Sequence, residues 1–282
     1  MGAADVVPGV SGGTIAFITG IYDELLDSIK RLGPGALKVL AQDGIGACWK
    51  HINGAFLLTL GSGILLSLFS LARVISWLLM THPIPLWSFF SGLILVSVWH
   101  MLRQLEGVKA STVVVLMVGA ALAWWISGMT PSGAAEPELP FLFMCGAVAI
   151  CAMILPGISG SFLLLLLGVY QPVLTAVATL DIPVLVTVAS GCVIGLLLFT
   201  RFLSWLLAYA RHFTLAFLTG LMLGSVNKLW PWKQATADQL FNVLPQTYEH
   251  LTGQSAQLTL ALAMGLCAVV MVLVIERVAK TS

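Results

Sequence analysis

Long stretches of the chain carry no charged side chain, and short polar connections separate them. A helix needs about 20 predominantly apolar residues to span a bilayer, and the uncharged stretches approach or exceed this length. None of Asp, Glu, Lys or Arg occurs within residues 54–72, 74–102, 110–135, 139–180, 182–200 or 250–275. The pattern therefore predicts an all-α polytopic membrane protein.

The same order of proline, glycine and apolar positions occurs twice. The sequence PGVSG at residues 8–12 returns 148 positions later as PGISG at 156–160. A second block repeats at a shift of 128, where 14 of the 40 residues in 62–101 are identical to those in 190–229. Shared proline, arginine and tryptophan positions do not follow from hydrophobicity alone. The chain therefore contains an internal duplication.

Each half of the duplication predicts the same series of elements. An apolar segment interrupted by Pro, Gly and Ser comes first, two helices follow, and a last helix closes the half. The expected bounds are 3–29, 54–80, 85–102 and 110–128 in the first half, and 140–176, 183–208, 213–229 and 256–275 in the second. We therefore expect one integral membrane domain made of a first repeat, 1–130, and a second repeat, 140–282.

Basic residues set the expected orientation, because Lys and Arg collect in the cytoplasmic loops of membrane proteins. The connections on one side hold Lys30, Arg31, Lys38, Lys50, Arg103, Lys109, Arg211, Arg277 and Lys280. The connections on the other side, at 80–85, 129–139, 171–182 and 230–255, hold few basic residues. If each interrupted segment is a re-entrant or broken helical hairpin, each half crosses the membrane with three further helices. Three is odd, so the halves form two inverted repeats, as in secondary transporters.

Charge and cysteine usage exclude several other classes of protein. With 13 Lys and Arg against 12 Asp and Glu, the chain has no basic surface for nucleic acid. Its five cysteines form no C-x-x-C pair, and its five histidines lack the spacing of metal ligands. We therefore expect no metal ion and no cofactor.

The two interrupted segments are the first candidate binding site. Proline and glycine break a helix, and irregular backbone at membrane depth is tolerated where it is buried in protein or lines a wet cavity. Free N–H groups after such a break, together with hydroxyl groups, suit an anion. The expected binding residues are Ser11, Gly12, Gly13, Thr14, Ser159, Gly160 and Ser161. The alternative interpretation is a pair of kinks that let helices pack closely.

Arg73 and Arg201 occupy equivalent positions in the two halves, and long apolar runs flank both. A charge in such a place indicates function, and a guanidinium matches the geometry of phosphate, so we assign both to substrate binding. The alternative is that both extend to the membrane interface. Asp5 is the only acid beside a break. Asp5, Glu24 and Asp23 are candidates for coupling to protons or sodium ions, and a solvated role for Asp5 is the alternative.

The opening sequence MGAADVVPGVSGGT resembles the signature of a bacterial membrane family. This is the family of polyprenyl-phosphate (undecaprenyl-phosphate) transporters, formerly catalogued as a domain of unknown function. The second signature, 155–161 with 168–170, is similar too, so the resemblance covers essentially the whole chain. One departure is that only seven residues precede the first PG, whereas the stretch before the second begins about 16 residues earlier. We therefore expect the first hairpin to lack its leading half.

The resemblance implies a flippase that returns undecaprenyl phosphate from the outer to the inner leaflet. The expected location is the cytoplasmic (inner) membrane of a bacterium, where the lipid carrier is reused in cell-envelope synthesis. The implied mechanism is alternating access, with the phosphate held at the two breaks and the paired arginines. The implied partners are the lipid phosphate and the bilayer.

Two other function classes remain open from the residues alone. Residues 9–13 match the G-x-S-x-G elbow of serine hydrolases, but that elbow needs a preceding strand and a histidine partner. We therefore expect no enzyme, and an intramembrane lipid-phosphate phosphatase stays as one alternative. A small-anion transporter is the other.

Overall fold

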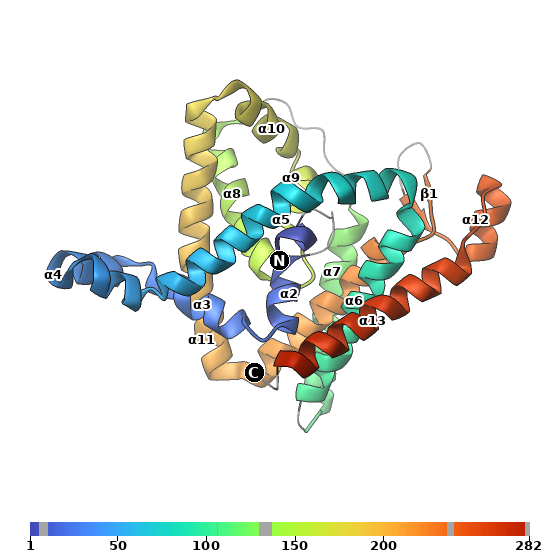
Figure 1. Cartoon of the computed structure of the whole chain (residues 1–282), viewed down its shortest axis with the longest axis horizontal. Coiled ribbons are helices and arrows are strands. Elements are labelled where there is room, and N and C mark those ends of the chain that lie inside the picture. The colour runs from blue at the N-terminus through green and yellow to red at the C-terminus, as the bar shows by residue number, and fades with distance from the viewer. Residues whose placement is uncertain (6–10, 106, 130–136, 236–239, 280–282) are drawn as a thin grey trace.

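A computed structural model of the chain describes residues 1–5, 11–105, 107–129, 137–235 and 240–279 (Figure 1). Helices make up nearly all of it, as the apolar pattern predicts. The elements up to residue 128 are α1 (Gly2–Asp5), α2 (Gly12–Ile18), α3 (Tyr22–Arg31), α4 (Pro34–His51), α5 (Gly54–Thr81), α6 (Pro83–Gln104) and α7 (Ala110–Gly128). The later elements are α8 (Leu139–Ile154), α9 (Gly160–Leu166), α10 (Tyr170–Thr179), α11 (Ile182–Leu229), β1 (Lys233–Ala235), β2 (Leu240–Asn242), α12 (Pro245–Thr252) and α13 (Leu258–Ala279).

Four helices of the described chain are long and apolar enough to cross a bilayer, namely α5, α6, α7 and α11. The pair α9–α10 passes the same test together but is bent by 105° at its break. Two shorter apolar helices, α8 and α13, complete the set. These findings confirm the prediction of an all-α membrane protein, and the expected spans coincide with the observed helices to within a few residues.

Duplicated sequence produces duplicated local backbone. α2 and α9 have seven residues each, α3 and α10 have ten each, and the glycine between them has φ of 74° at Gly20 and 72° at Gly168. α5 ends at Thr81, and the next residue, His82, has φ and ψ of −136° and 57°. The equivalent residue, Ala210, kinks α11 with φ and ψ of −136° and 45°. The 48-residue α11 is therefore two helices that correspond to α5 and α6.

Helices from the two halves of the chain pack directly on one another. α11 packs against α7, and α13 packs along α6 (Figure 1). Glycine permits both contacts: a Cβ on Gly92 would lie 2.4 Å from the carbonyl oxygen of Gly265, and one on Gly220 would lie 2.0 Å from that of Leu116. These approaches are closer than any larger side chain allows, so the glycines fix how deeply the helices interlock.

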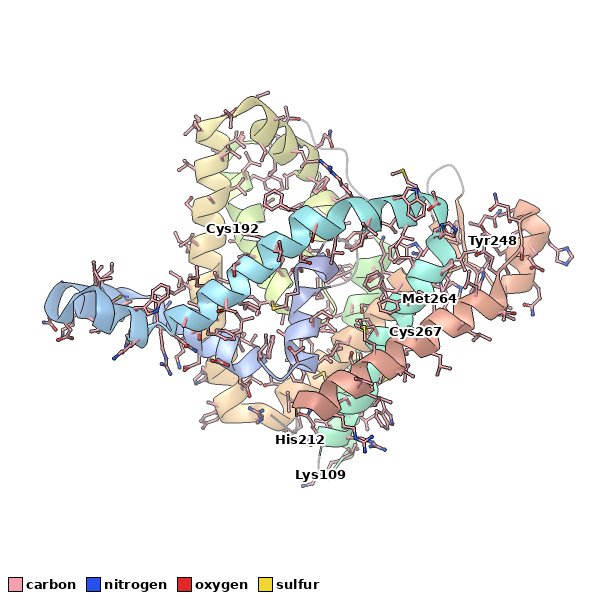
Figure 2. The ribbon with its side chains drawn as sticks, in the orientation of Figure 1. Lys109, Cys192, His212, Tyr248, Met264 and Cys267 are labelled. Carbon is pink, nitrogen blue, oxygen red and sulfur yellow. The ribbon has the colours of Figure 1, made fainter. Side chains whose placement is uncertain are left out.

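Two of the predicted cytoplasmic connections, the one before α7 and the one at the kink of α11, meet at one end of the molecule. Thr112, in the first turn of α7, hydrogen-bonds His212 just after the kink of α11, at 2.8 Å. Lys109 and His212 are labelled at that end in Figure 2. Arg211 also pairs there with Asp23 of α3, at 3.0 Å. These contacts hold the start of α7, the kink of α11 and α3 together, and the side of the membrane on which they lie stays a prediction.

Two features were not predicted from the sequence. The polar stretch between Lys30 and Asn53 contains the helix α4, and the 230–255 connection contains the antiparallel hairpin β1–β2 followed by α12. Indole N–H groups hold the second of these in place. Trp230 donates to the carbonyl oxygen of Val243 at 2.8 Å, and Trp232 donates to that of Ala256 at 2.9 Å.

Candidate functional site

The two helix breaks meet inside the molecule. Ser11 caps the N-terminus of α2, and its hydroxyl accepts a hydrogen bond from the Gly13 N–H at 3.1 Å. The same hydroxyl lies 3.0 Å from the carbonyl oxygen of Met153 and 3.2 Å from that of Leu155, at the end of α8. The first break therefore binds the backbone that leads into the second.

Two further side chains of the first half hold this backbone. The Gly157 N–H donates to the Thr14 hydroxyl at 3.1 Å, and the Tyr22 hydroxyl donates to the carbonyl oxygen of Ile154 at 3.1 Å. A Cβ on Gly13 would lie 2.4 Å from that same Ile154 oxygen, so only glycine permits the approach. We call Ser11, Thr14 and Tyr22 the latch. All three side chains are buried, and their polar groups already have partners within the protein.

A carboxylate of the chain itself occupies the start of α2. The Gly12 N–H donates to Asp5 Oδ1 at 2.7 Å. An acid at a helix N-terminus compensates the partial positive charge of the unpaired N–H groups. The residue equivalent to Asp5 in the second half is Met153, which has no charge. The first break is therefore neutralised internally, and the second is not neutralised in this way.

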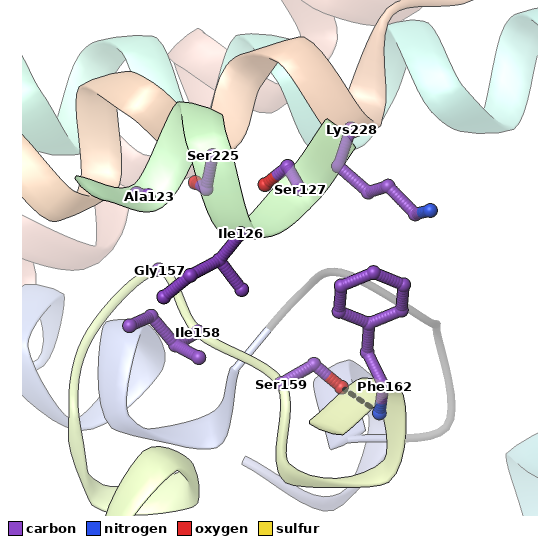
Figure 3. Close-up of a pocket in the computed structure, with 9 residues that line it drawn as sticks. All are labelled: Ala123, Ile126, Ser127, Gly157, Ile158, Ser159, Phe162, Ser225 and Lys228. Carbon is purple, nitrogen blue, oxygen red and sulfur yellow. Dashed lines mark hydrogen bonds between the residues drawn. The ribbon is translucent and has the colours of Figure 1, made fainter. Parts of the chain in front are cut away.

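The second break lines a pocket between the ends of α7 and α11 (Figure 3). One wall is apolar and another carries hydroxyl groups and one ammonium group. The lining residues are Ala123, Ile126, Ser127, Gly157, Ile158, Ser159, Phe162, Ser225 and Lys228. The Ser159 hydroxyl accepts from the Phe162 N–H at 3.4 Å and lies 2.9 Å from the Ser161 hydroxyl.

Lys228 supplies the positive charge of the pocket. Its Nζ lies 4.1 Å from the centre of the Phe162 ring. Within the described residues, no carboxylate pairs with this ammonium group. A cation that rests on an aromatic face while half-buried keeps its hydrogen-bond donors for another acceptor. The pocket thus combines hydroxyl and ammonium donors, both suited to a phosphate, with an apolar wall.

A second lysine contacts the backbone of Lys228. Lys233 of β1 donates from Nζ to the carbonyl oxygen of Lys228, and the same Nζ lies 4.5 Å from the centre of the Trp87 ring. Burial lowers the pKa of Lys233 to about 8, and the positive charge of Lys228 contributes to this lowering. Two neighbouring cations repel each other, so an anion bound near Lys228 would be electrostatically favoured.

The paired arginines lie outside this pocket. Arg201 donates from Nη1 to the carbonyl oxygen of Leu197 at 2.8 Å, and its guanidinium contacts Gly33 at the junction of α3 and α4. Arg73 is exposed on α5. Of the residues that we assigned to binding from the sequence, Ser159 is the one that lines the pocket, and the structure does not bring either arginine to it.

The candidate coupling acids other than Asp5 hold the connections together. Glu24 Oε1 accepts from the Asn53 amide at 2.8 Å, and Asp23 pairs with Arg211. Within the described ranges, no group of three or more His, Cys, Asp or Glu side chains is arranged to hold a metal ion.

Sequence reasoning missed Lys228 and Lys233 because it used the basic residues of the connections only to set orientation. A signal was present. Lys228 lies at the end of an apolar helix beside the repeated Ser225, and the equivalent position in the first half is His100. The two copies of this position therefore differ in charge.

Comparisons with known proteins agree with the resemblance found in the sequence. Residues 1–243 match the model of the VCA0040-like family, described as undecaprenyl phosphate translocase-like. A protein of Vibrio cholerae serotype O1 named polyprenyl-phosphate transporter is 55% identical over 99% of this chain and 94% of its own length. A protein of Staphylococcus aureus with the same name is 32% identical over 82% of this chain and 83% of its own. No solved structure matches the chain. The chain therefore belongs to the undecaprenyl phosphate translocase-like family.

Proposed function

We propose that the chain moves undecaprenyl phosphate from the outer to the inner leaflet of the bacterial cytoplasmic membrane. The names of its relatives in two bacteria support a polyprenyl phosphate as the substrate. Such a lipid needs a cationic, hydroxyl-bearing site for its headgroup and an apolar surface for the first units of its tail. The pocket between α7, α9 and α11 offers both.

One observation carries the assignment of the headgroup site. The Lys228 ammonium, free of any described carboxylate, faces the same pocket as the Ser159 hydroxyl. Ser127 and Ser225 add hydroxyl groups, and Ile126 with Phe162 forms the apolar wall. Hydrogen bonds between an ammonium group and a phosphate are charge-assisted and stronger than neutral ones. In this assignment Lys228 and Ser159 bind the phosphate, and Lys233 adds a second positive charge.

The pocket belongs to the outer side in this proposal. It lies where α7 and α11 lead into the connections at 129–139 and 230–255, which hold few basic residues. By the Lys and Arg rule those connections lie outside. The latch lies at the first break and buries it. In this proposal the described conformation is therefore open toward the outside and closed toward the cytoplasm.

Alternating access then follows from two inverted repeats, which we propose on the basis of the matching kinks and glycine turns. In the inward-facing state, the first break would become accessible from the cytoplasm, and the second would be buried against it. Ser11, Gly12, Gly13 and Thr14 would then receive the phosphate, and Asp5 would have to leave the Gly12 N–H. A carboxylate that competes with the substrate phosphate is a natural place for proton coupling. Arg73 and Arg201 lie at the same place in equivalent helices that inverted repeats would orient oppositely, so they would attract the lipid phosphate at the two membrane surfaces.

Transport by purified protein in vesicles tests the proposal. Labelled undecaprenyl phosphate is placed in the outer leaflet, and its appearance in the inner leaflet is followed with and without protein. We expect movement with the native chain, a large loss with Lys228→Met, and little change with Lys30→Met, which removes an exposed lysine far along the chain. A native chain that moves no lipid phosphate would overturn the proposed function.

The pocket does not favour an enzyme. Ser159 hydrogen-bonds Ser161 and the Phe162 N–H, and within the described residues no histidine or carboxylate hydrogen-bonds its hydroxyl. A serine nucleophile needs such a base. We therefore propose a transporter without enzymatic activity, and the vesicle assay includes a measurement of released inorganic phosphate, which we expect to be absent.

A further inference from the structure

The segment between α3 and α5 is loosely packed against the rest of the described chain. Figure 1 shows α4 standing out from one side of the molecule. Of its eighteen residues, only Ala36 is buried. Large apolar side chains are nevertheless exposed on it: Leu37 is 69% exposed, Ile45 79%, Leu40 41% and Trp49 44%. Apolar side chains gathered in this way mark a surface that another phase or molecule covers.

α4 is folded into two short arms. Gly44 interrupts it with φ of 83° and ψ of 178°. The Cys48 thiol of the second arm contacts the carbonyl oxygen of Ala36 in the first, at 3.5 Å. Leu37 and Leu40 are three residues apart in the first arm, and Ile45 and Trp49 are four apart in the second. At these spacings each pair lies on one side of its helix, so each arm carries an apolar stripe.

The two arms are fixed where a membrane span begins. His51 ends α4, and the apolar helix α5 starts three residues later at Gly54. The Trp49 ring packs against Gly54, and Arg31 Nη1 donates to the carbonyl oxygen of His51 at 3.4 Å. Asn53, which has a left-handed backbone conformation, connects the end of α4 and the start of α5 to α3, because its amide donates to Glu24. A candidate membrane span begins at Gly54, so this anchoring places α4 beside the end of that span that the basic residues assign to the cytoplasm.

Charge on and around α4 is mainly positive. Lys38 and Lys50 are exposed on the two arms, with Asp43 as the one acid in the helix. Lys30 and Arg31 precede it, with Arg31 paired to Asp27, and the Arg201 guanidinium contacts Gly33 at its root. Two copies of such a surface would repel each other, whereas the anionic headgroups of a cytoplasmic leaflet attract it. Helices with an apolar stripe and flanking lysines lie in the membrane interface.

We propose that α4 docks on the cytoplasmic leaflet, with Leu37, Leu40, Ile45 and Trp49 in the headgroup boundary and Lys38 and Lys50 bound to anionic phospholipids. The occupant of its apolar stripe is thus the lipid surface itself. This contact is separate from the substrate pocket, so it stands or falls independently of the transport function.

Hydrogen–deuterium exchange of the full chain tests the contact without altering it. Single copies are placed in nanodiscs of phosphatidylcholine alone or with phosphatidylglycerol, and exchange is measured for residues 34–51. A lysine near an anionic surface contributes about fivefold in binding, so we expect exchange to slow with phosphatidylglycerol and Lys38→Gln with Lys50→Gln to remove that slowing. Arg103→Gln, in another connection, serves as the matched control. Equal exchange in both lipids would overturn the role of anionic lipid.

Spin labels then identify what covers the apolar stripe. Labels are placed at Ile45→Cys and, as a polar control on the same helix, at Gln42→Cys, in a chain whose native cysteines are replaced by alanine. We expect the label at 45 to be accessible to oxygen and shielded from a water-soluble nickel reagent, and the label at 42 to show the reverse. Equal accessibility of both labels to the nickel reagent would contradict docking on lipid. Strong coupling between labels on two copies would show a dimer contact instead.

Discussion

The two helix breaks have nearly the same sequence and different surroundings. At the first, Ser11 and Thr14 are buried against the backbone of residues 153–157, and the carboxylate of Asp5 occupies the Gly12 N–H. At the second, Ser159 faces a pocket with Lys228, and the position equivalent to Asp5 is an uncharged methionine. The same motif therefore serves once as a brace and once as a candidate binding surface. The difference arises from the partner side chains rather than from the motif.

Removing the ammonium group of the pocket is expected to have the largest effect. A hydrogen bond to a charged group contributes about 1.5–3 kcal/mol, so Lys228→Met should lower transport by about 10- to 100-fold. The equivalent position in the first half is His100, and His100→Met should lower transport much less. Initial rates in vesicles measure both. Equal losses in the two variants would mean that the breaks do not differ as described.

Breaking the latch should affect stability before it affects binding. Thr14→Val leaves the buried Gly157 N–H without its acceptor, which costs about 1–3 kcal/mol in the free energy of unfolding. Thr14→Ser keeps the hydroxyl and should recover most of that loss. Denaturation in detergent, followed by circular dichroism, measures the difference. Unchanged stability of the valine variant would show that the bond between the two breaks is not formed.

Serine at each break can be compared directly. Ser159→Ala should weaken substrate binding by about five- to tenfold, since one hydrogen bond contributes about 1 kcal/mol, and should also lower stability somewhat, because the hydroxyl caps α9 through a long bond from the Phe162 N–H. Ser11→Ala should lower stability more, because it removes three hydrogen-bonding contacts, while the KM for lipid phosphate supplied at the outer leaflet stays near that of the native chain. The proposed difference between the two serines would be contradicted if both variants changed KM and neither changed stability.

The glycine turns test whether the two halves have the same local backbone conformation. Gly20 and Gly168 both have positive φ, and a residue with a Cβ is disfavoured there by about 1 kcal/mol. Gly20→Ala and Gly168→Ala should therefore lower the free energy of unfolding by similar amounts. Because no atom would lie within 4 Å of a Cβ on Gly20, its loss reports backbone strain alone. A much larger loss at one position would show that the turns are not equivalent.

The smallest expected effect is a dependence on pH. Burial and the charge of Lys228 lower the pKa of Lys233 from 10.5 to about 8. Substrate affinity should fall by a few-fold as the pH rises through 8, because Lys233 loses its positive charge while the phosphate stays a dianion. Stability should rise over the same range, since the unfolded chain binds more protons between pH 8 and 10.5. Lys233→Arg should abolish both trends, and an unchanged affinity profile in this variant would exclude Lys233.

The apolar helices were predictable because hydropathy reports burial in lipid directly, and uncharged runs such as 54–72 and 110–135 contain no competing signal. α4 was not predictable in this way, since residues 34–51 mix apolar, glycine and charged positions without a regular period. The site was predicted in part. Ser159 followed from the broken motif, whereas Lys228 was missed because a lysine near a helix end is usually a topology signal. The engagement of Ser11 and Thr14 depends on contacts between segments more than 140 residues apart, and a duplicated motif does not reveal which copy has such partners.

The close approach of Gly92 to Gly265 has a consequence for how the protein is made. α6 is synthesised well before its partner α13, which begins at Leu258. Until α13 is made, the surface around Gly92 must therefore be covered by lipid or by the insertion machinery. α7 likewise lacks its packing partner until the second part of α11 has been synthesised. Neither half of the chain can complete its packing alone, so a premature stop before residue 258 would leave a protein whose early helices are inserted yet never assembled.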